Sequence, residues 1–135
     1  MVSPVMAAPA YLLDSSACVR LLRGRAGVSD LPARNEIAIS SVVAAELWAG
    51  AEKSGRPAEA VRLEELFGLF PVLDFDHAAA RHYGEIRADL ERKRTPIGPL
   101  DLLIAAHARN LGATLITRNA GEFKRVKGLK VQAWK

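Results

Sequence analysis

The sequence has little of what a disulfide-bonded or zinc-bound fold requires. Of its 135 residues only one is cysteine, Cys18, so no internal disulfide can form and no second thiol is present for a structural zinc site. The three histidines, His77, His82 and His107, lack the spacing of zinc ligands. We therefore expect Cys18 and the histidines to be packing or surface residues, in a protein of a reducing compartment.

Long apolar runs and low-complexity segments are absent as well. No stretch approaches the roughly 20 apolar residues of a membrane span, and residues 1–9 lack the basic and apolar regions of a signal peptide. We expect no membrane association and a cytoplasmic location. The length and the 50% hydrophobic content fit one buried core. We expect residues 1–10 to be an N-terminal extension and residues 11–135 to be a single domain.

The charge is mildly basic. There are 19 Lys and Arg residues against 15 Asp and Glu residues, which gives a net charge of +4 and favours a polyanionic partner. The Gly-Arg-Ala-Gly segment at 24–27 lacks the glycine spacing and the preceding strand of a phosphate-binding loop. The sequence therefore argues against dinucleotide or ATP binding.

Short apolar runs alternate with longer segments of helical period. This alternation predicts an α/β fold with a mostly parallel central sheet flanked by helices. Expected strands cover 11–13, 37–39, 72–75, 114–116 and 130–134, and expected helices cover 41–54, 58–69, the segment after Asp76 and 99–111. A first helix follows Ser15 and Ser16, which offer capping oxygens. In the helix at 99–111 we expect the core face to carry Leu100, Leu103, Ile104, His107 and Leu111.

Acidic and amide side chains fall where the predicted strands end. Asp14 ends the first strand, Glu46 lies in the first turns of the helix after the second, and Asp101 lies in the first turn of the helix before the fourth. Asn119 and Glu122 follow the fourth strand. Open α/β sheets place their sites at the carboxyl ends of strands, so we expect these side chains at one edge of the sheet.

Carboxylates gathered at one edge repel one another unless a divalent cation holds them. Oxygen ligands without thiols or imidazoles point to Mg²⁺ or Mn²⁺. Glu46 borders the apolar face of its helix, where an unpartnered carboxylate is costly to bury. The sequence therefore predicts a metal site formed by Asp14, Asp101 and Glu46, the last directly or through a water.

Each of these residues also has a structural interpretation. Asp14 could simply cap a helix, and Asp101 could be a favourable charge at a helix N-terminus. Asn119 and Glu122 could be a turn residue and a solvated surface residue. Only the joint placement of the five supports a functional interpretation.

At these positions the sequence resembles the PIN-domain family, in particular the VapC-type toxins of bacterial toxin–antitoxin pairs. "YLLDSSA" is similar to the family's opening strand with its first aspartate, and "ISSVVAAELWAG" to its glutamate helix. "IGPLDLLIAAHARNLGATLITRNAGEF" is similar to its third-acid helix and the strand that follows. The resemblance covers residues 11–134, and its last motif is the most specific.

The resemblance implies a PIN-like three-layer sandwich and a Mg²⁺-dependent endoribonuclease toxin that cuts single-stranded or loop RNA. It also implies a homodimer neutralised by a cognate VapB-type antitoxin. By this resemblance Asp14 and Asp101 are metal ligands and Glu46 completes the acidic cluster, often through water. Many relatives have aspartate in place of Asn119, so either a second metal binds weakly or Glu122 supplies the missing charge.

Two other interpretations keep an α/β fold. Asn119 leaves open a catalytically weak PIN-fold protein that binds RNA or acts as a scaffold. A phospho-acceptor receiver domain would need paired acids after the first strand, where serines follow Asp14 here. In the ribonuclease interpretation, RNA is held by basic residues at the rim, for which the candidates are Arg20, Arg23, Arg25, Arg92, Lys93, Arg94, Lys124, Arg125 and Lys127.

Overall fold

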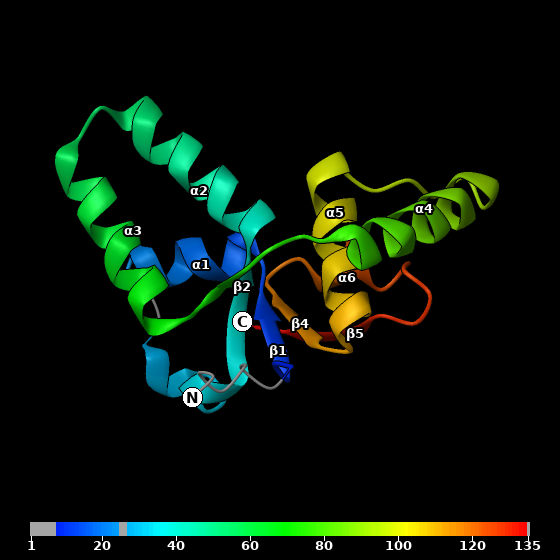
Figure 1. Cartoon of the computed structure of the whole chain (residues 1–135), viewed down its shortest axis with the longest axis horizontal. Coiled ribbons are helices and arrows are strands. Elements are labelled where there is room, and N and C mark those ends of the chain that lie inside the picture. The colour runs from blue at the N-terminus through cyan, green and yellow to red at the C-terminus, as the bar shows by residue number, and fades with distance from the viewer. Residues whose placement is uncertain (1–7, 25–26, 135) are drawn as a thin grey trace, which may run out of the picture.

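The computed structural model describes residues 8–24 and 27–134, and its elements alternate along the chain as expected (Figure 1). Within this part, the strands are β1 (Tyr11–Leu13), β2 (Ile37–Ser40), β3 (Val72–Leu73), β4 (Thr114–Thr117) and β5 (Lys130–Ala133). The helices are α1 (Ser15–Leu22), α2 (Ser41–Ser54), α3 (Pro57–Leu69), α4 (His77–Arg92), α5 (Pro99–Leu111) and α6 (Ala120–Phe123), with short 3₁₀ turns at Val28–Asp30 and Arg34–Glu36. Residues 1–7 of the expected extension lie outside the described residues.

The strands form one sheet in the order β3-β2-β1-β4-β5, and every neighbouring pair is parallel. In Figure 1, α1, α2 and α3 lie to one side of the strands and α4, α5 and α6 to the other. The predicted α/β sandwich is confirmed, with a sheet that is entirely rather than mostly parallel. The chain order reverses between β1 and β4, and such a switch point opens a crevice at the carboxyl ends of the strands.

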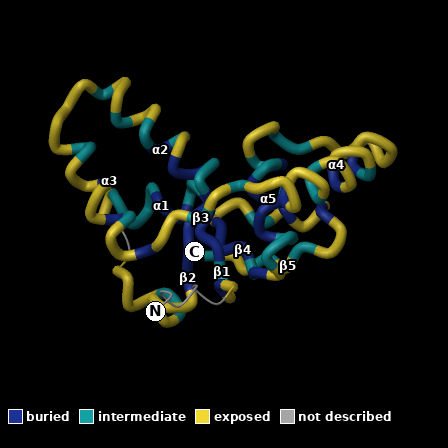
Figure 2. The backbone as a smooth tube through the Cα atoms, in the orientation of Figure 1, coloured by how far each residue is buried: buried dark blue, intermediate teal, exposed yellow. Residues whose placement is uncertain are grey.

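The core is built on the central strands. Leu12, Leu13, Ile39, Leu115 and Ile116 are fully buried, as expected of strands covered by helices on both faces. Figure 2 shows these strands as buried, whereas the far ends of the α2–α3 hairpin and of α4 are largely exposed. No helix in the described part of the chain is long and apolar enough to cross a membrane.

Helix termini follow local side-chain chemistry. Ser40 caps α2 by accepting from the Val42 amide at 3.1 Å, and Asp76 caps α4 by accepting from the Ala79 amide at 2.9 Å. The expectation that a serine caps α1 is wrong, because Ser15 and Ser16 already lie in the helix and Asp14 takes the capping position.

Two further expectations are corrected. The third strand ends at Leu73 rather than Phe75, because the Phe75 amide donates to the Ser41 hydroxyl (3.0 Å) instead of continuing the sheet. Leu100 is 43% exposed and does not belong to the core face of α5, although Ile104 and His107 do. The buried surface of α5 continues over the small residues 105, 106 and 108, because the helix packs against both α4 and the sheet.

Cys18 and the histidines are packing or surface residues, as expected. Cys18 is fully buried, and burial raises the pKa of its thiol well above its ordinary value. His107 is buried with its Nδ1 2.8 Å from the Ser40 hydroxyl, and burial lowers its pKa. His82 accepts a hydrogen bond from Arg109, and His77 is exposed.

Candidate active site

The predicted acidic residues lie near one another beyond the carboxyl ends of β1 and β4. Asp14 directly follows β1, and its amide donates to the Ile116 carbonyl at 3.1 Å, so the residue is held beside β4. Glu46 lies in the second turn of α2, Asp101 in the first turn of α5, and Glu122 in α6. α2 follows β2 and α6 follows β4, whereas α5 precedes β4 and brings its first turn to the same edge of the sheet. The fold therefore makes neighbours of residues that are far apart in sequence.

Asp14 is the buried centre of the cluster, at 3% exposure. Its carboxylate accepts from the Ala17 amide (2.9 Å), from the Ser16 hydroxyl (2.7 Å) and from the Thr117 hydroxyl. Burial raises the pKa of this carboxyl, and the hydrogen bonds, which lower it, offset only part of that effect. Asp14 is therefore both a helix cap and a site residue, and the two interpretations open at the sequence level are compatible.

Asp101 and Glu122 form a carboxyl pair. Burial raises the pKa of Asp101 to about 7, assisted by a side-chain hydrogen bond with Glu122 and by the charge of that residue. The charges of Asp14 and Glu46 raise it further. The four acids therefore share one electrostatic environment, in which loss of the proton from Asp101 is disfavoured.

Glu46 is oriented from the neighbouring helix. Its Oε1 accepts from the Ser15 hydroxyl at 2.8 Å, which joins α2 to the first turn of α1. Ser15 thus positions Glu46 rather than Asp14, while Ser16 binds Asp14. Both serines therefore contact the acidic cluster.

Asn119 and Glu122 occupy different places. Glu122 accepts from the Gly98 amide through Oε1 (2.9 Å) and from the Asn119 side-chain amide through Oε2 (2.9 Å). Glu122 therefore lies between Asn119 and Asp101, and Asn119, which is exposed, supports Glu122. Of the two residues considered for the fourth acidic position, the structure brings Glu122 to Asp101.

The sequence analysis did not single out Thr117 and Gly98. Thr117 ends β4, is fully buried, donates to Asp14 and accepts from the Asn119 amide at 2.9 Å. Gly98 holds Glu122 through its backbone amide just before α5. The signal for Thr117 was present, since a polar residue follows the apolar pair Leu115 and Ile116 beside the predicted site.

The basic residues proposed for the rim are dispersed. Arg20 lies 5.1 Å from the ring centroid of Trp134, and Lys93 pairs with Asp89 at 2.9 Å on the exposed side of α4. Arg125 donates to the Pro96 carbonyl at 3.1 Å. Arg23 lines a groove that also contains Glu46, whereas Arg25 lies outside the described residues.

The acidic cluster has the chemistry of a divalent-cation site. Among the residues that the structure describes, none of the four acids forms an ion pair with a basic side chain. In the same part of the chain, no three carboxylate, histidine or cysteine side chains converge closely enough to hold a metal by themselves. Mg²⁺ commonly binds through one or two carboxylates and takes its other ligands from water and substrate phosphates, so these residues fit it.

Fold and site define the class of protein. The sequence model of the PIN domain matches residues 11–129, and the chain belongs to the PIN-domain family. It is 41% identical over 128 residues to the tRNA(fMet)-specific endonuclease VapC of Shigella flexneri, covering 92% of this chain and 97% of that protein. It is 38% identical over 130 residues to ribonuclease VapC2 of Rickettsia felis, with the same two coverages.

Solved structures agree with this assignment. VapBC2 from Rickettsia felis, bound to a DNA fragment from its promoter, has a TM-score of 0.87 at 37% identity and covers 93% of this chain and 98% of that chain. DNA-bound VapBC from Salmonella typhimurium has a TM-score of 0.80 at 34% identity, covering 94% and 99%. The resemblance to VapC-type toxins seen in the sequence motifs is confirmed.

Proposed function

We propose that this protein is a Mg²⁺-dependent endoribonuclease toxin that cuts single-stranded or loop RNA and is neutralised by a cognate VapB-type antitoxin. The observation that carries the proposal is the cluster of Asp14, Glu46, Asp101 and Glu122 at the β1–β4 switch point, without a basic partner among the described residues. VapC ribonucleases that match almost the whole chain support the same chemistry.

Asp14 and Asp101 would hold the cation directly, and Glu46 would hold it through a water. When bound there, Mg²⁺ supplies positive charge to the scissile phosphate and lowers the pKa of an attacking water. Mn²⁺ has the same preference for oxygen ligands and would substitute.

The chain's own residues position the reacting groups. The Thr117 and Ser16 hydroxyls hold the two oxygens of Asp14, and the Ser15 hydroxyl holds Glu46. In the metal-free site, burial and the three neighbouring acids raise the pKa of Asp101 to about 7, and a bound cation would displace that proton.

The alternative of a catalytically weak RNA-binding or scaffolding protein rested on Asn119. Because Glu122 reaches Asp101, the cluster keeps four carboxylates despite the amide at position 119. This arrangement favours the enzyme.

The test is cleavage of a single-stranded RNA and of tRNA(fMet), the substrate named for the Shigella flexneri relative, by the purified protein. We expect cleavage with Mg²⁺ that EDTA stops. Asp14→Asn should abolish it without unfolding the protein, because asparagine also caps helices well. Glu36→Gln, an exposed acid ahead of β2, is the matched control and should cleave as the wild type does. RNA binding without cleavage would leave the scaffold alternative.

The partner proposal rests on the relatives, whose solved structures are VapBC complexes. Expression of this chain alone should arrest growth, and co-expression with the product of an adjacent reading frame should restore it. The purified toxin should be a homodimer. Normal growth without any partner would contradict the toxin assignment.

A further inference from the structure

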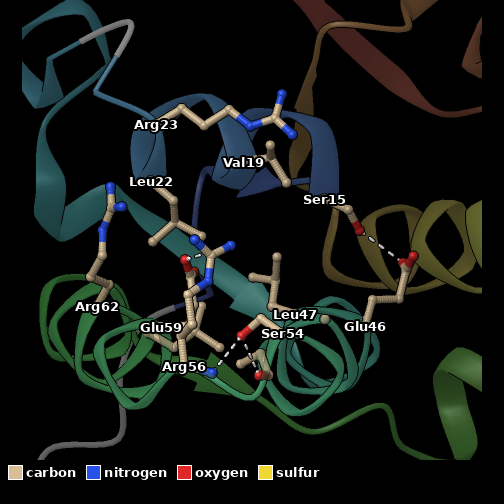
Figure 3. A pocket seen from close by; sticks show the side chains of 13 residues that line it. Ser15, Val19, Leu22, Arg23, Glu46, Leu47, Ser54, Arg56, Glu59 and Arg62 are labelled. Atoms are coloured by element: carbon tan, nitrogen blue, oxygen red, sulfur yellow. Dashed lines mark hydrogen bonds and ion pairs between the residues drawn. The ribbon is translucent and has the colours of Figure 1, made fainter.

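A groove of about 440 Å³ leads away from the acidic cluster between α1 and the α2–α3 hairpin (Figure 3). Ser15 and Glu46, which are hydrogen-bonded to each other, line the groove where it meets the acidic cluster. An RNA strand that is cut beside Glu46 extends beyond the scissile phosphate on both sides. The groove begins at Ser15 and Glu46 and could therefore hold one of these two sides.

The groove combines an apolar lining with arginines. Its apolar members include Val19, Leu22 and Leu47, and its basic members are Arg23, Arg56 and Arg62. None of the described residues that line it is aromatic, so it offers no stacking platform for bases. The lining is therefore suited to contact a nucleic-acid backbone rather than to recognise individual bases.

The three arginines differ in whether a nearby carboxylate offsets their charge. Arg56 lies 4.0 Å from Glu59, so part of its charge is offset. Arg23 and Arg62 are exposed and form no ion pair with another residue in the described part of the chain. Figure 3 shows Arg23, which directly follows the last residue of α1, and Arg62 of α3 at different places along the groove. Two uncompensated guanidinium groups therefore follow the groove away from the acids.

A polyanion needs such groups at this place. Four carboxylates repel every phosphate that is not neutralised by a cation, so an RNA strand near them requires positive charge on the flanking positions. Guanidinium groups bind phosphates by paired hydrogen bonds and keep their charge at any physiological pH.

We propose that this groove holds the RNA strand on one side of the scissile phosphate, with Arg23 and Arg62 binding its backbone phosphates. This inference rests on the proposed ribonuclease function. It adds two binding residues outside the acidic cluster, and Arg62 does not stand out in the sequence.

The test compares the double variant Arg23→Gln/Arg62→Gln with the control Arg34→Gln/Arg81→Gln, which removes two exposed arginines that do not line the groove. With a single-stranded RNA and saturating Mg²⁺, we expect the groove variant to raise KM about tenfold and to keep kcat within about twofold. Loss of two phosphate contacts should lower the slope of log affinity against log salt by about 1.4. The control should match the wild type.

Trimming the RNA locates the contacts. Nucleotides removed from one side of the cut should raise the wild-type KM, and the same trimming should change the KM of the groove variant little; trimming the other side should affect both proteins equally. A groove variant that matches the control on intact RNA would overturn the inference, and if it also weakened a complex with the antitoxin, the groove would be a protein-docking site instead. A wild type that does not cleave at all would instead refute the proposed function.

Discussion

At the scale of single residues, Asp101 is the acid whose protonation is altered most clearly. Its pKa lies at about 7, against an ordinary value of 3.8. Between these values the folded protein binds more protons than the unfolded chain, so the stability of the metal-free protein falls as the pH rises from about 4 to about 7. The contribution of Asp101 to the free energy of unfolding is therefore most favourable below pH 3.8, the ordinary pKa that the unfolded chain has.

We therefore expect Asp101→Asn to abolish cleavage and yet to stabilise the metal-free protein above neutral pH. The gain should be on the order of 1–2 kcal/mol, reduced from the full shift because the side chain is partly exposed. Thermal unfolding in EDTA at several pH values measures it, with Glu36→Gln as control. A stability difference that stays constant from acidic to alkaline pH would contradict the shifted pKa.

The second residue-scale prediction concerns the fourth acid. Glu122 is bonded to Asn119 and paired with Asp101, so we expect Glu122→Gln to raise the Mg²⁺ concentration for half-maximal cleavage about tenfold. Asn119→Asp should lower this Mg²⁺ concentration little, because the substitution replaces a hydrogen-bond donor to Glu122 with a second negative charge. Metal titrations of both variants decide the matter. Tighter binding by Asn119→Asp with no effect of Glu122→Gln would reverse the assignment.

At the scale of elements, Ser40 joins β2, α2 and α5. Its hydroxyl caps α2 through the Val42 amide and lies 2.8 Å from Nδ1 of buried His107. Ser40→Ala removes the cap and leaves a buried imidazole nitrogen without its partner, so we expect a loss of about 2 kcal/mol.

Urea unfolding measures this loss. Ser54→Ala, at the other end of α2, should cost less, because Ser54 is only half-buried and water can replace its contacts. Burial lowers the pKa of His107 below its ordinary value of 6.5. The stability that the neutral imidazole contributes is therefore complete above about pH 6.5 and is lost as the pH falls toward the pKa of the folded protein. Equal losses for the two serine variants would show that the link to α5 contributes nothing.

At the scale of the whole molecule, stability should depend on the metal. The carboxylate cluster joins β1, α2, α5 and α6, and a cation bound only by the folded protein stabilises it by mass action, by about 2.7 kcal/mol at a hundredfold excess over Kd. We expect Mg²⁺ to raise the Tm of the wild type and to leave that of Asp14→Asn nearly unchanged. An equal rise in both proteins would indicate binding elsewhere.

Local chemistry in the sequence determined much of the fold. The apolar runs and helical periods predicted all five strands, and Ser40, Asp76 and the glycines after α2 and α5 set helix ends through capping. The carboxyl ends of parallel strands share one edge, so the expectation that Asp14, Glu46 and Asp101 lie near one another followed from the predicted parallel sheet and needed no side-chain detail.

Tertiary structure alone decided which side chains touch. The Thr117 hydroxyl reaches Asp14 across 103 positions, Glu122 reaches the Gly98 amide across 24, and Ser15 reaches Glu46 across 31. Local periodicity cannot specify such contacts, because they depend on how α1, α2 and α6 pack around the switch point between β1 and β4. The exposure of Leu100 and the groove lined by Arg23 and Arg62 have the same origin, since helix packing determines which faces remain open to solvent.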